Sequence, residues 1–444
     1  MKRELFKQLV AWKNKPNRKP LLLQGARQVG KTYLINQFGK DEYKQFVSLN
    51  FEREPQLKTL FEGSLSAEQI IENIELFIGA KIDPQNALIF FDEIQVVPEV
   101  ITSLKYFNEQ KPEYNIIAAG SLLGVSVGKD RSFPVGKVNF MTLYPMSFSE
   151  YLIAFEEELL VNKLNTIDKI EPLPELLHDK LISYLKKYLF LGGMPEVIQS
   201  YKENGDIGLV REIQNEILES YKRDFSKYTD KSQAIKTSEV WNSIPNQLAK
   251  ENKKFKYNDV SKNARSSLYE STIEWLKNAG LIYIVNNISA PKLPLSGYAD
   301  RSKFKIYMMD TGLLVAMLNI SSEIVLSSDL FSEYNGAFIE NFVASELIVY
   351  GEKELYYWSS RSDAEVDYIL QTDSNIIPLE VKSGSSTNIK SLRSYAGKYN
   401  PQIVLRTSPR NLIRSEDFIN VPLYLIPLIN RIAKGEIDWF YTKL

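Results

Sequence analysis

The chain of 444 residues contains no cysteine and a single histidine, His178. Disulfide bonds, thiolate catalysis and cysteine-based zinc sites are therefore excluded, and one histidine cannot form a multi-histidine metal site. No apolar run approaches the length of a membrane span, and the N-terminus leads into an amphipathic helix rather than a signal peptide. We therefore expect a cytoplasmic protein without a membrane partner.

An excess of charge of either sign is also missing. Lysine and arginine number 54 and aspartate and glutamate 55, which gives a net charge of -1. The whole chain therefore has no general attraction to nucleic acid, and a DNA-binding surface must be a local patch. Hydrophobic residues make up 44% and charged residues 25%, as in globular proteins, and the length exceeds that of one ordinary core. We expect several domains.

A glycine-rich loop follows the apolar strand expected at residues 21–23 and precedes a helix expected over 32–38. Its G-x-x-x-x-G-K-[ST] pattern consists of Gly25, Ala26, Arg27, Gln28, Val29, Gly30, Lys31 and Thr32. The glycines let backbone N–H groups surround phosphates, Lys31 adds a charge for the β- and γ-phosphates, and the Thr32 hydroxyl suits magnesium. A chance glycine-rich turn is the alternative, but the order of strand, loop and helix favours ATP and Mg²⁺ as cofactors.

An acidic pair, Asp92 and Glu93, ends the buried strand expected over residues 86–91. Parallel sheets bind their ligands at this end of a strand, so Asp92 suits magnesium and Glu93 suits the polarisation of an attacking water. The pair could instead merely cap the next helix. Ser121 follows another strand, over 115–119, where it can sense the γ-phosphate or simply occupy a turn. We predict Glu93, Lys31 and Ser121 as catalytic residues, and Thr32 and Asp92 as metal ligands.

Strands alternate with helices from residue 18 to about residue 145, which predicts an α/β fold with the parallel sheet of a P-loop NTPase. Ser147 and Glu150 form the pattern of a capping box, where we expect a helical lid to begin. The predicted domains are an ATPase core, the helical lid, a winged helix and a C-terminal α/β domain, over residues 1–150, 151–232, 233–325 and 326–444.

The third of these domains has the order of elements of a winged helix. Its helices and strands are expected over residues 238–249, 267–278, 281–287 and 303–308. Lys262, Asn263 and Arg265 precede the second helix, which suits contact with DNA in the major groove. Glu270 and Glu274 lie on the same helix, so its charge is mixed, and a purely structural role stays open.

A hairpin is expected near the C-terminus, with strands at residues 365–370 and 376–382. Glu380 and Lys382 share one face because strand side chains alternate, and Asp367 can reach that face from the partner strand. A divalent-metal site explains the two carboxylates. A cross-strand ion pair on a solvated sheet face explains the same residues.

Six stretches, in this order and spacing, resemble the prokaryotic AAA-type ATPases that carry a C-terminal domain of unknown function. They are residues 25–32, 89–95, 120–121, 144–152, 192–196 and 221–224. The resemblance covers nearly the whole chain and implies ATP hydrolysis, a winged helix and a site completed by an arginine from a neighbouring subunit. We therefore expect a weak or ligand-dependent homo-oligomer. Similar proteins often have an arginine where this chain has Lys137, which leaves Arg131 and Arg223 as candidate arginine fingers.

The C-terminal hairpin resembles the Asp…Glu-x-Lys core of restriction-endonuclease-like folds, with Glu340 as a fourth member. The resemblance implies that Asp367 and Glu380 hold magnesium, while Lys382 orients the water that attacks a phosphodiester. Three functions follow. The protein is an ATPase that drives or gates a DNA-handling or nuclease-like module, a nucleotide-gated binding or scaffold protein with an inactive nuclease-like domain, or an ATP-regulated DNA endonuclease.

Overall fold

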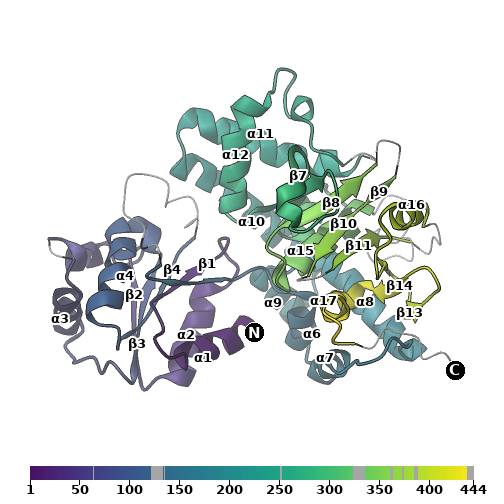
Figure 1. Ribbon diagram of the computed structural model, residues 1–444. Helices are drawn as coiled ribbons and strands as arrows, with labels where there is room; N and C mark the ends of the chain where they lie inside the picture. The colour runs from purple at the N-terminus through teal and green to yellow at the C-terminus, as the bar shows by residue number, and fades with distance from the viewer. Residues whose placement is uncertain are drawn as a thin grey trace. The chain divides into compact units, whose positions relative to one another are not determined.

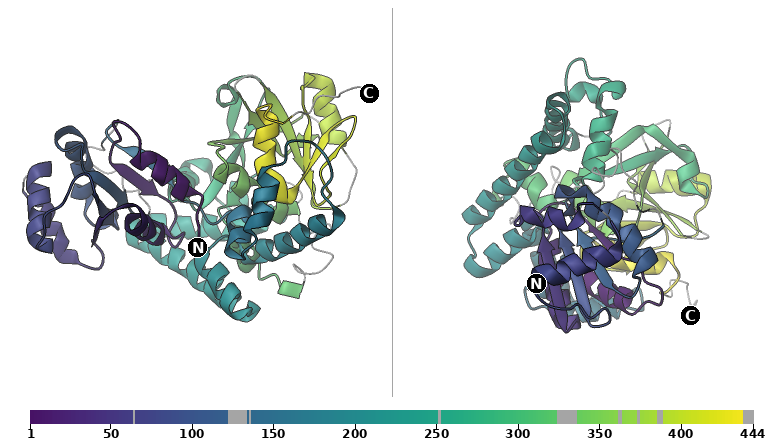
Figure 2. Two further views of the ribbon diagram at one scale, coloured as in Figure 1. Left: turned by 90° about the horizontal axis from the view of Figure 1, so that it is seen from below. Right: turned by 90° about the vertical axis from the view of Figure 1, so that its left-hand side faces the viewer.

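The computed structural model describes residues 1–63, 65–121, 134, 136–250, 253–323, 336–360, 364–372, 375–384 and 389–437. The chain forms two compact units. The first comprises Met1–Tyr144, drawn in purple and blue in Figure 1 and Figure 2, together with Asn278–Leu281. The second comprises Pro145–Lys277 and Ile282–Leu444. No helix in the described part of the chain is both long and apolar enough to cross a membrane.

The first unit is built on a parallel sheet of five strands in the order β2-β3-β4-β1-β5. The strands are β1 (Leu21–Gln24), β2 (Gln45–Asn50), β3 (Ala87–Asp92), β4 (Asn115–Ala119) and β5 (Asn139–Thr142). Every residue of β3 and β4 is buried, as expected for central strands with both faces covered. The predicted α/β fold with a parallel sheet is therefore confirmed.

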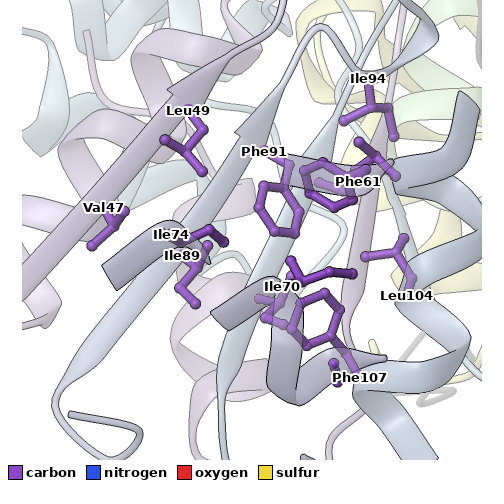
Figure 3. Packing of buried hydrophobic residues seen from close by; sticks show 14 of the residues in the cluster. Val47, Leu49, Phe61, Ile70, Ile74, Ile89, Phe91, Ile94, Leu104 and Phe107 are labelled. Carbon is purple, nitrogen blue, oxygen red and sulfur yellow. The ribbon is translucent and has the colours of Figure 1, made fainter. Parts of the chain in front are cut away.

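Helices cover both faces of this sheet (Figure 1). They are α1 (Leu5–Lys13), α2 (Lys31–Glu42), α3 (Ala67–Ile78) and α4 (Pro98–Gln110), with short 3₁₀ turns η1 (Pro55–Phe61) and η2 (Ile94–Val96). On the face covered by α3 and α4, Figure 3 shows Phe61, Ile70, Leu104 and Phe107 gathered around Phe91. The Phe91 and Phe61 rings meet edge to face, with centroids 5.5 Å apart. This packing fixes the carboxyl end of β3, where Asp92 lies.

The second unit begins with a group of helices. They are α6 (Phe148–Ala154), α7 (Glu158–Asn165), α8 (Glu175–Leu191), α9 (Pro195–Asn204) and α10 (Ile207–Tyr228). The predicted capping box is present, because the Ser147 hydroxyl accepts from the Glu150 N–H and the Glu150 carboxylate accepts from the Ser147 N–H. Between α8 and α9, a Cβ on Gly193 would lie 2.2 Å from the Met146 carbonyl oxygen. Only glycine fits at this crossing.

Two further helices lead to a sheet of four strands in the order β7-β6-β8-β9. The elements are α11 (Lys231–Leu248), η3 (Tyr257–Asp259), α12 (Ser266–Asn278), β6 (Ile282–Ile288), η4 (Leu295–Tyr298), β7 (Ala299–Met308), β8 (Leu355–Ser359) and β9 (Glu365–Val366). The predicted pairing of β6 with β7 is confirmed and antiparallel. However, β6 also pairs in parallel with β8, so the two strands expected as a wing belong to a larger sheet.

The remaining strands form a third sheet in the order β10-β11-β12-β14-β13. They are β10 (Tyr368–Gln371), β11 (Ile376–Val381), β12 (Leu405–Ser408), β13 (Ile413–Arg414) and β14 (Ile419–Pro422). The helical elements of this region are α13 (Thr311–Met317), α15 (Gly336–Val349), α16 (Lys390–Tyr399), η7 (Leu423–Leu425) and α17 (Ile426–Ala433). The predicted hairpin is confirmed for residues 368–371 and 376–379, where β10 and β11 pair antiparallel. Its first strand was expected to begin at Glu365, but Glu365 and Val366 pair with β8 in the other sheet. Asp367 lies between β9 and β10, where the chain passes from one sheet to the other.

Candidate nucleotide-binding and hydrolysis site

The phosphate loop has the backbone geometry that its glycines allow. Gly25 and Gly30 have φ angles of 146° and 93°, in the region that favours glycine. A Cβ on Gly25 would lie 2.2 Å from the Leu143 carbonyl oxygen, so the loop also passes too close to its neighbour for a side chain. Gly30 provides no capping side chain for α2, and the N–H groups and positive end of this helix suit a phosphate.

Lys31 lies within the curve of this loop and is only 7% exposed. Its Nζ donates to the carbonyl oxygens of Gly25, at 3.0 Å, and Ala26, at 2.7 Å. Burial lowers the pKa of Lys31 to about 8, although the nearby carboxylates of Glu93 and Asp92 act in the opposite direction. The ammonium therefore has uncharged carbonyl partners, which negatively charged phosphate oxygens can replace.

Thr32 and Asp92 meet at the carboxyl end of β3. The Thr32 hydroxyl donates to Asp92 Oδ2 at 2.9 Å, and Asn50 Nδ2 donates to the same oxygen at 2.9 Å. Asp92 is 2% exposed, and burial raises its pKa. A hydroxyl beside a carboxylate provides the oxygen ligands that magnesium prefers, so Thr32 and Asp92 fit this ion. The sequence interpretation gave Asn50 no role, although a polar residue at the carboxyl end of a predicted strand could have indicated one.

Glu93 and Ser121 lie at the ends of the adjacent strands β3 and β4. Glu93 has a φ of 55°, which is uncommon outside glycine. Gln95 connects the two residues, since its Nε2 donates to Glu93 Oε2 and lies 3.3 Å from Ser121 Oγ. The structure therefore brings the predicted Glu93 and Ser121 together through a residue to which the sequence interpretation gave no role.

The candidate arginine fingers fall in different places. Arg223 is exposed on α10, and Arg131 lies outside the described residues. Lys137, at the position where similar proteins often have an arginine, pairs with Glu109 at 3.0 Å. Assignment of an arginine finger stays a prediction.

The C-terminal candidate site contains a lysine that the sequence interpretation missed. Lys305, on β7, is 1% exposed. Its Nζ lies 2.7 Å from Glu365 Oε1 and 3.7 Å from Asp367 Oδ1. Glu340, on α15, lies 3.7 Å from the same Nζ, accepts from the Tyr307 hydroxyl at 2.7 Å and also pairs with Lys253. Three carboxylates therefore surround a buried ammonium group.

The electrostatics of this cluster separate Glu340 from Asp367. Burial raises the pKa of Asp367 to about 7, and the charge of Glu340 acts in the same direction. Burial also opposes ionisation of Glu340, but the ammonium groups of Lys253 and Lys305 hold its pKa at about 2. Glu340 is therefore the anion that the two lysines neutralise.

Glu380 and Lys382 pair with each other. Asp367 Oδ2 instead accepts from the Val381 N–H at 2.8 Å. Burial raises the pKa of Glu380, and its Oε2 is buried without a hydrogen-bond partner among the described residues. Within the described segments, no group of three or more acidic or histidine side chains is arranged to hold a metal ion. The structure thus pairs Asp367 and Glu340 with Lys305, and Glu380 with Lys382.

Family models match three parts of the chain. Residues 17–152 match an AAA domain, and residues 182–324 and 335–426 match two domains of unknown function, DUF8612 and DUF4143. An uncharacterized protein of Mycobacterium tuberculosis and one of Mycobacterium bovis are each 34% identical over 100 residues. This stretch is 22% of the present chain and 22% of each relative, so about a fifth of these curated relatives is matched.

Solved structures show a remote likeness. AMPPCP-bound DnaA from Aquifex aeolicus has 16% identity and a TM-score of 0.27, over 62% of this chain and 85% of that chain. The Aeropyrum pernix ORC1 protein in complex with DNA has 12% identity and a TM-score of 0.28, over 72% of this chain and 91% of that chain. These scores carry no functional argument. The AAA family match, the parallel sheet and the phosphate loop together support an AAA-type P-loop ATPase domain over residues 17–152.

Proposed function

We propose that this protein binds ATP with magnesium, hydrolyses it, and uses turnover to gate a C-terminal DNA-handling part. The observation that carries the ATPase proposal is the meeting of Thr32 and Asp92 beside the loop that holds Lys31. These groups lie at the carboxyl end of a parallel sheet, where such folds bind nucleotides. The geometry therefore supports phosphoryl transfer to water better than other chemistry.

The residues have distinct tasks in this reaction. Lys31 exchanges its two carbonyl partners for β- and γ-phosphate oxygens, and Glu93 orients a water and accepts its proton. The water oxygen bonds to the γ-phosphorus as the bond to the bridging oxygen breaks, and the proton passes from Glu93 to the released phosphate. Magnesium, held by Thr32 and Asp92 when bound, neutralises phosphate charge.

The test of nucleotide binding is Lys31→Ala. We expect it to abolish binding of a non-hydrolysable ATP analogue with magnesium, measured by calorimetry, because it removes the buried ammonium that the loop surrounds. Lys40→Ala is the matched control, since Lys40 is exposed in the last turn of the same helix. Equal affinities of Lys31→Ala and the wild type would contradict the assignment.

A basic pocket supports the DNA-handling part of the proposal. It encloses about 630 Å³ between η3, the start of α12 and β7. Its lining includes Lys256, Arg265 and Arg301, all exposed, with Glu270 as the acidic residue. None of the three cations forms an ion pair with a described residue. Such unpaired cations around one pocket suit the phosphates of a nucleic-acid backbone.

The salt dependence of DNA binding tests this pocket. If the three cations each contact a phosphate of duplex DNA, log K falls against log salt with a slope of about −2.7, and each change to alanine reduces the slope by roughly 1. Lys277→Ala, in the last turn of α12, is the control. If a variant with all three cations changed to alanine keeps the wild-type slope, the pocket does not bind DNA. No DNA binding by an active ATPase would favour the scaffold alternative.

The Lys305 cluster favours an inactive nuclease-like domain over an ATP-regulated endonuclease. The buried Lys305 ammonium lies 3.7 Å from the carboxylates of both Asp367 and Glu340, which a catalytic metal would need as ligands. We expect no nicking of DNA by the wild type with magnesium or manganese. Nicking that disappears in Asp367→Ala would instead assign cleavage to the predicted site of Glu340, Asp367, Glu380 and Lys382.

We also propose a weak or ligand-dependent homo-oligomer, because no described arginine is an evident finger within one chain. ATPase activity per protomer should fall on dilution. Constant activity in a species shown to be monomeric by light scattering would contradict this.

A further inference from the structure

Gln95 occupies a bridging position in the candidate hydrolysis site. It lies in η2, directly after the acidic pair, and its Nε2 donates to the carboxylate of Glu93. The same nitrogen lies 3.3 Å from Ser121 Oγ, and Ser121 is 1% exposed. One amide group therefore connects the proposed base to the proposed sensor of the γ-phosphate.

The other end of this amide is unused. Gln95 Oε1 is buried and has no hydrogen-bond partner among the described residues. An unpaired buried acceptor destabilises a folded protein, so its presence requires an explanation, and a catalytic role is one. The donor that the hydrolysis reaction brings to this place is the attacking water, which has two hydrogens and needs only one to contact Glu93.

The backbone conformation of Glu93 also points to a functional role for this segment. Glu93 has a φ of 55°, a backbone conformation that is strained for a residue other than glycine. The turn is closed by a hydrogen bond from the Val96 N–H to the Glu93 carbonyl oxygen at 3.1 Å. Gln95 lies inside this turn, so its side chain and that of Glu93 are held together by a strained segment at the end of β3.

We propose that Gln95 is a further catalytic residue of the ATPase, because it orients both Glu93 and the attacking water. Nε2 donates a hydrogen bond to the Glu93 carboxylate and lies beside the Ser121 hydroxyl. Oε1 accepts a hydrogen bond from the second O–H group of the water. A γ-phosphate that binds Ser121 thereby fixes the amide, and the amide fixes the base and the water. This inference rests on the proposed ATP hydrolysis. It assigns to Gln95 the coupling between γ-phosphate binding at Ser121 and the positioning of Glu93 and the water.

The test compares two variants of Gln95 with different shapes. Gln95→Leu removes both polar atoms, and Gln95→Glu keeps the shape but cannot donate to Glu93. Hydrogen bonds to charged groups contribute roughly 1.5–3 kcal/mol, so we expect kcat for ATP to fall about 10- to 150-fold in each. KM and the affinity for the non-hydrolysable analogue should stay within about threefold, because Gln95 acts after binding. Gln56→Leu, exposed in η1, is the matched control.

A double variant tests the coupling to Ser121. Because Gln95 and Ser121 act through one connected set of hydrogen bonds, Gln95→Leu combined with Ser121→Ala should be at most about twofold slower than the slower single variant. Losses that multiply would show that the two residues act independently.

Three outcomes would overturn the inference. They are a wild-type kcat in both Gln95 variants, multiplicative losses in the double variant, and a parallel fall of kcat, analogue affinity and Tm that marks a merely structural role. The failure of the proposed function is distinct, because the wild-type protein itself would then hydrolyse no ATP. If Gln95→Leu does not fold, the kcat of Gln95→Glu alone tests the inference.

Discussion

The affinity for ATP should depend on pH through Lys31. Burial lowers the pKa of this lysine to about 8 in the nucleotide-free protein. A lysine with a lowered pKa is charged below that value and neutral above it, and only the charged form attracts phosphate. Phosphate binding restores the proton, so the affinity falls as pH rises through 8. At pH 9 the free lysine is about nine-tenths neutral, which corresponds to roughly tenfold weaker binding.

The assay is calorimetric titration with a non-hydrolysable ATP analogue and magnesium between about pH 7 and 9.5, where the phosphates are already ionised. Lys40→Ala should keep the same pH dependence because Lys40 is exposed at the other end of α2. Circular dichroism over the same range controls for unfolding. A constant affinity across this range would refute the argument, since it would mean that Lys31 is either fully charged throughout or not in contact with phosphate.

Two further predictions concern the second unit. Lys305→Met should lower the free energy of unfolding by about 3–5 kcal/mol in urea titrations, because it removes the ammonium group beside the buried Asp367 and leaves Glu340 with Lys253 alone; an unchanged midpoint would contradict this. Asp310→Ala removes the acceptor of the Gly193 N–H, at 2.6 Å, and the Leu313 N–H, at 2.9 Å. Asp310→Ala should lower the free energy of unfolding by roughly 2–6 kcal/mol, and Asp310→Asn should lower it by less. Equal losses in the two variants would argue against these hydrogen bonds as the cause.

The sequence predicts the phosphate loop and the acidic strand end because these features are local. Gly25, Gly30 and Lys31 act within one loop, and an apolar run followed by Asp92 and Glu93 needs only one strand. Strand β2 and strand β4 have the predicted bounds for the same reason. In contrast, β5 was missed, since its four residues are only partly apolar and partly buried at the edge of the sheet.

Other features depend on contacts between distant parts of the chain. Asn50 reaches Asp92 only because β2 and β3 are neighbours, and Lys305 is buried only because α15 and the β9–β10 junction bring carboxylates around it. Similarly, the predicted hairpin of β6 and β7 is correct, but its parallel partner β8 comes much later in the sequence. Periodicity within one segment contains no information about such pairings.

The most direct test of the central claim is to measure ATP binding and ATP turnover side by side in Glu93→Gln. This change removes the carboxylate that accepts the proton of the attacking water, while the contact between Thr32 and Asp92 stays intact. We predict an affinity for ATP and magnesium within about threefold of the wild type and a kcat lowered by roughly 10²-fold or more. Turnover at the wild-type rate would contradict the assignment of Glu93 as the base and, with it, the proposed mechanism.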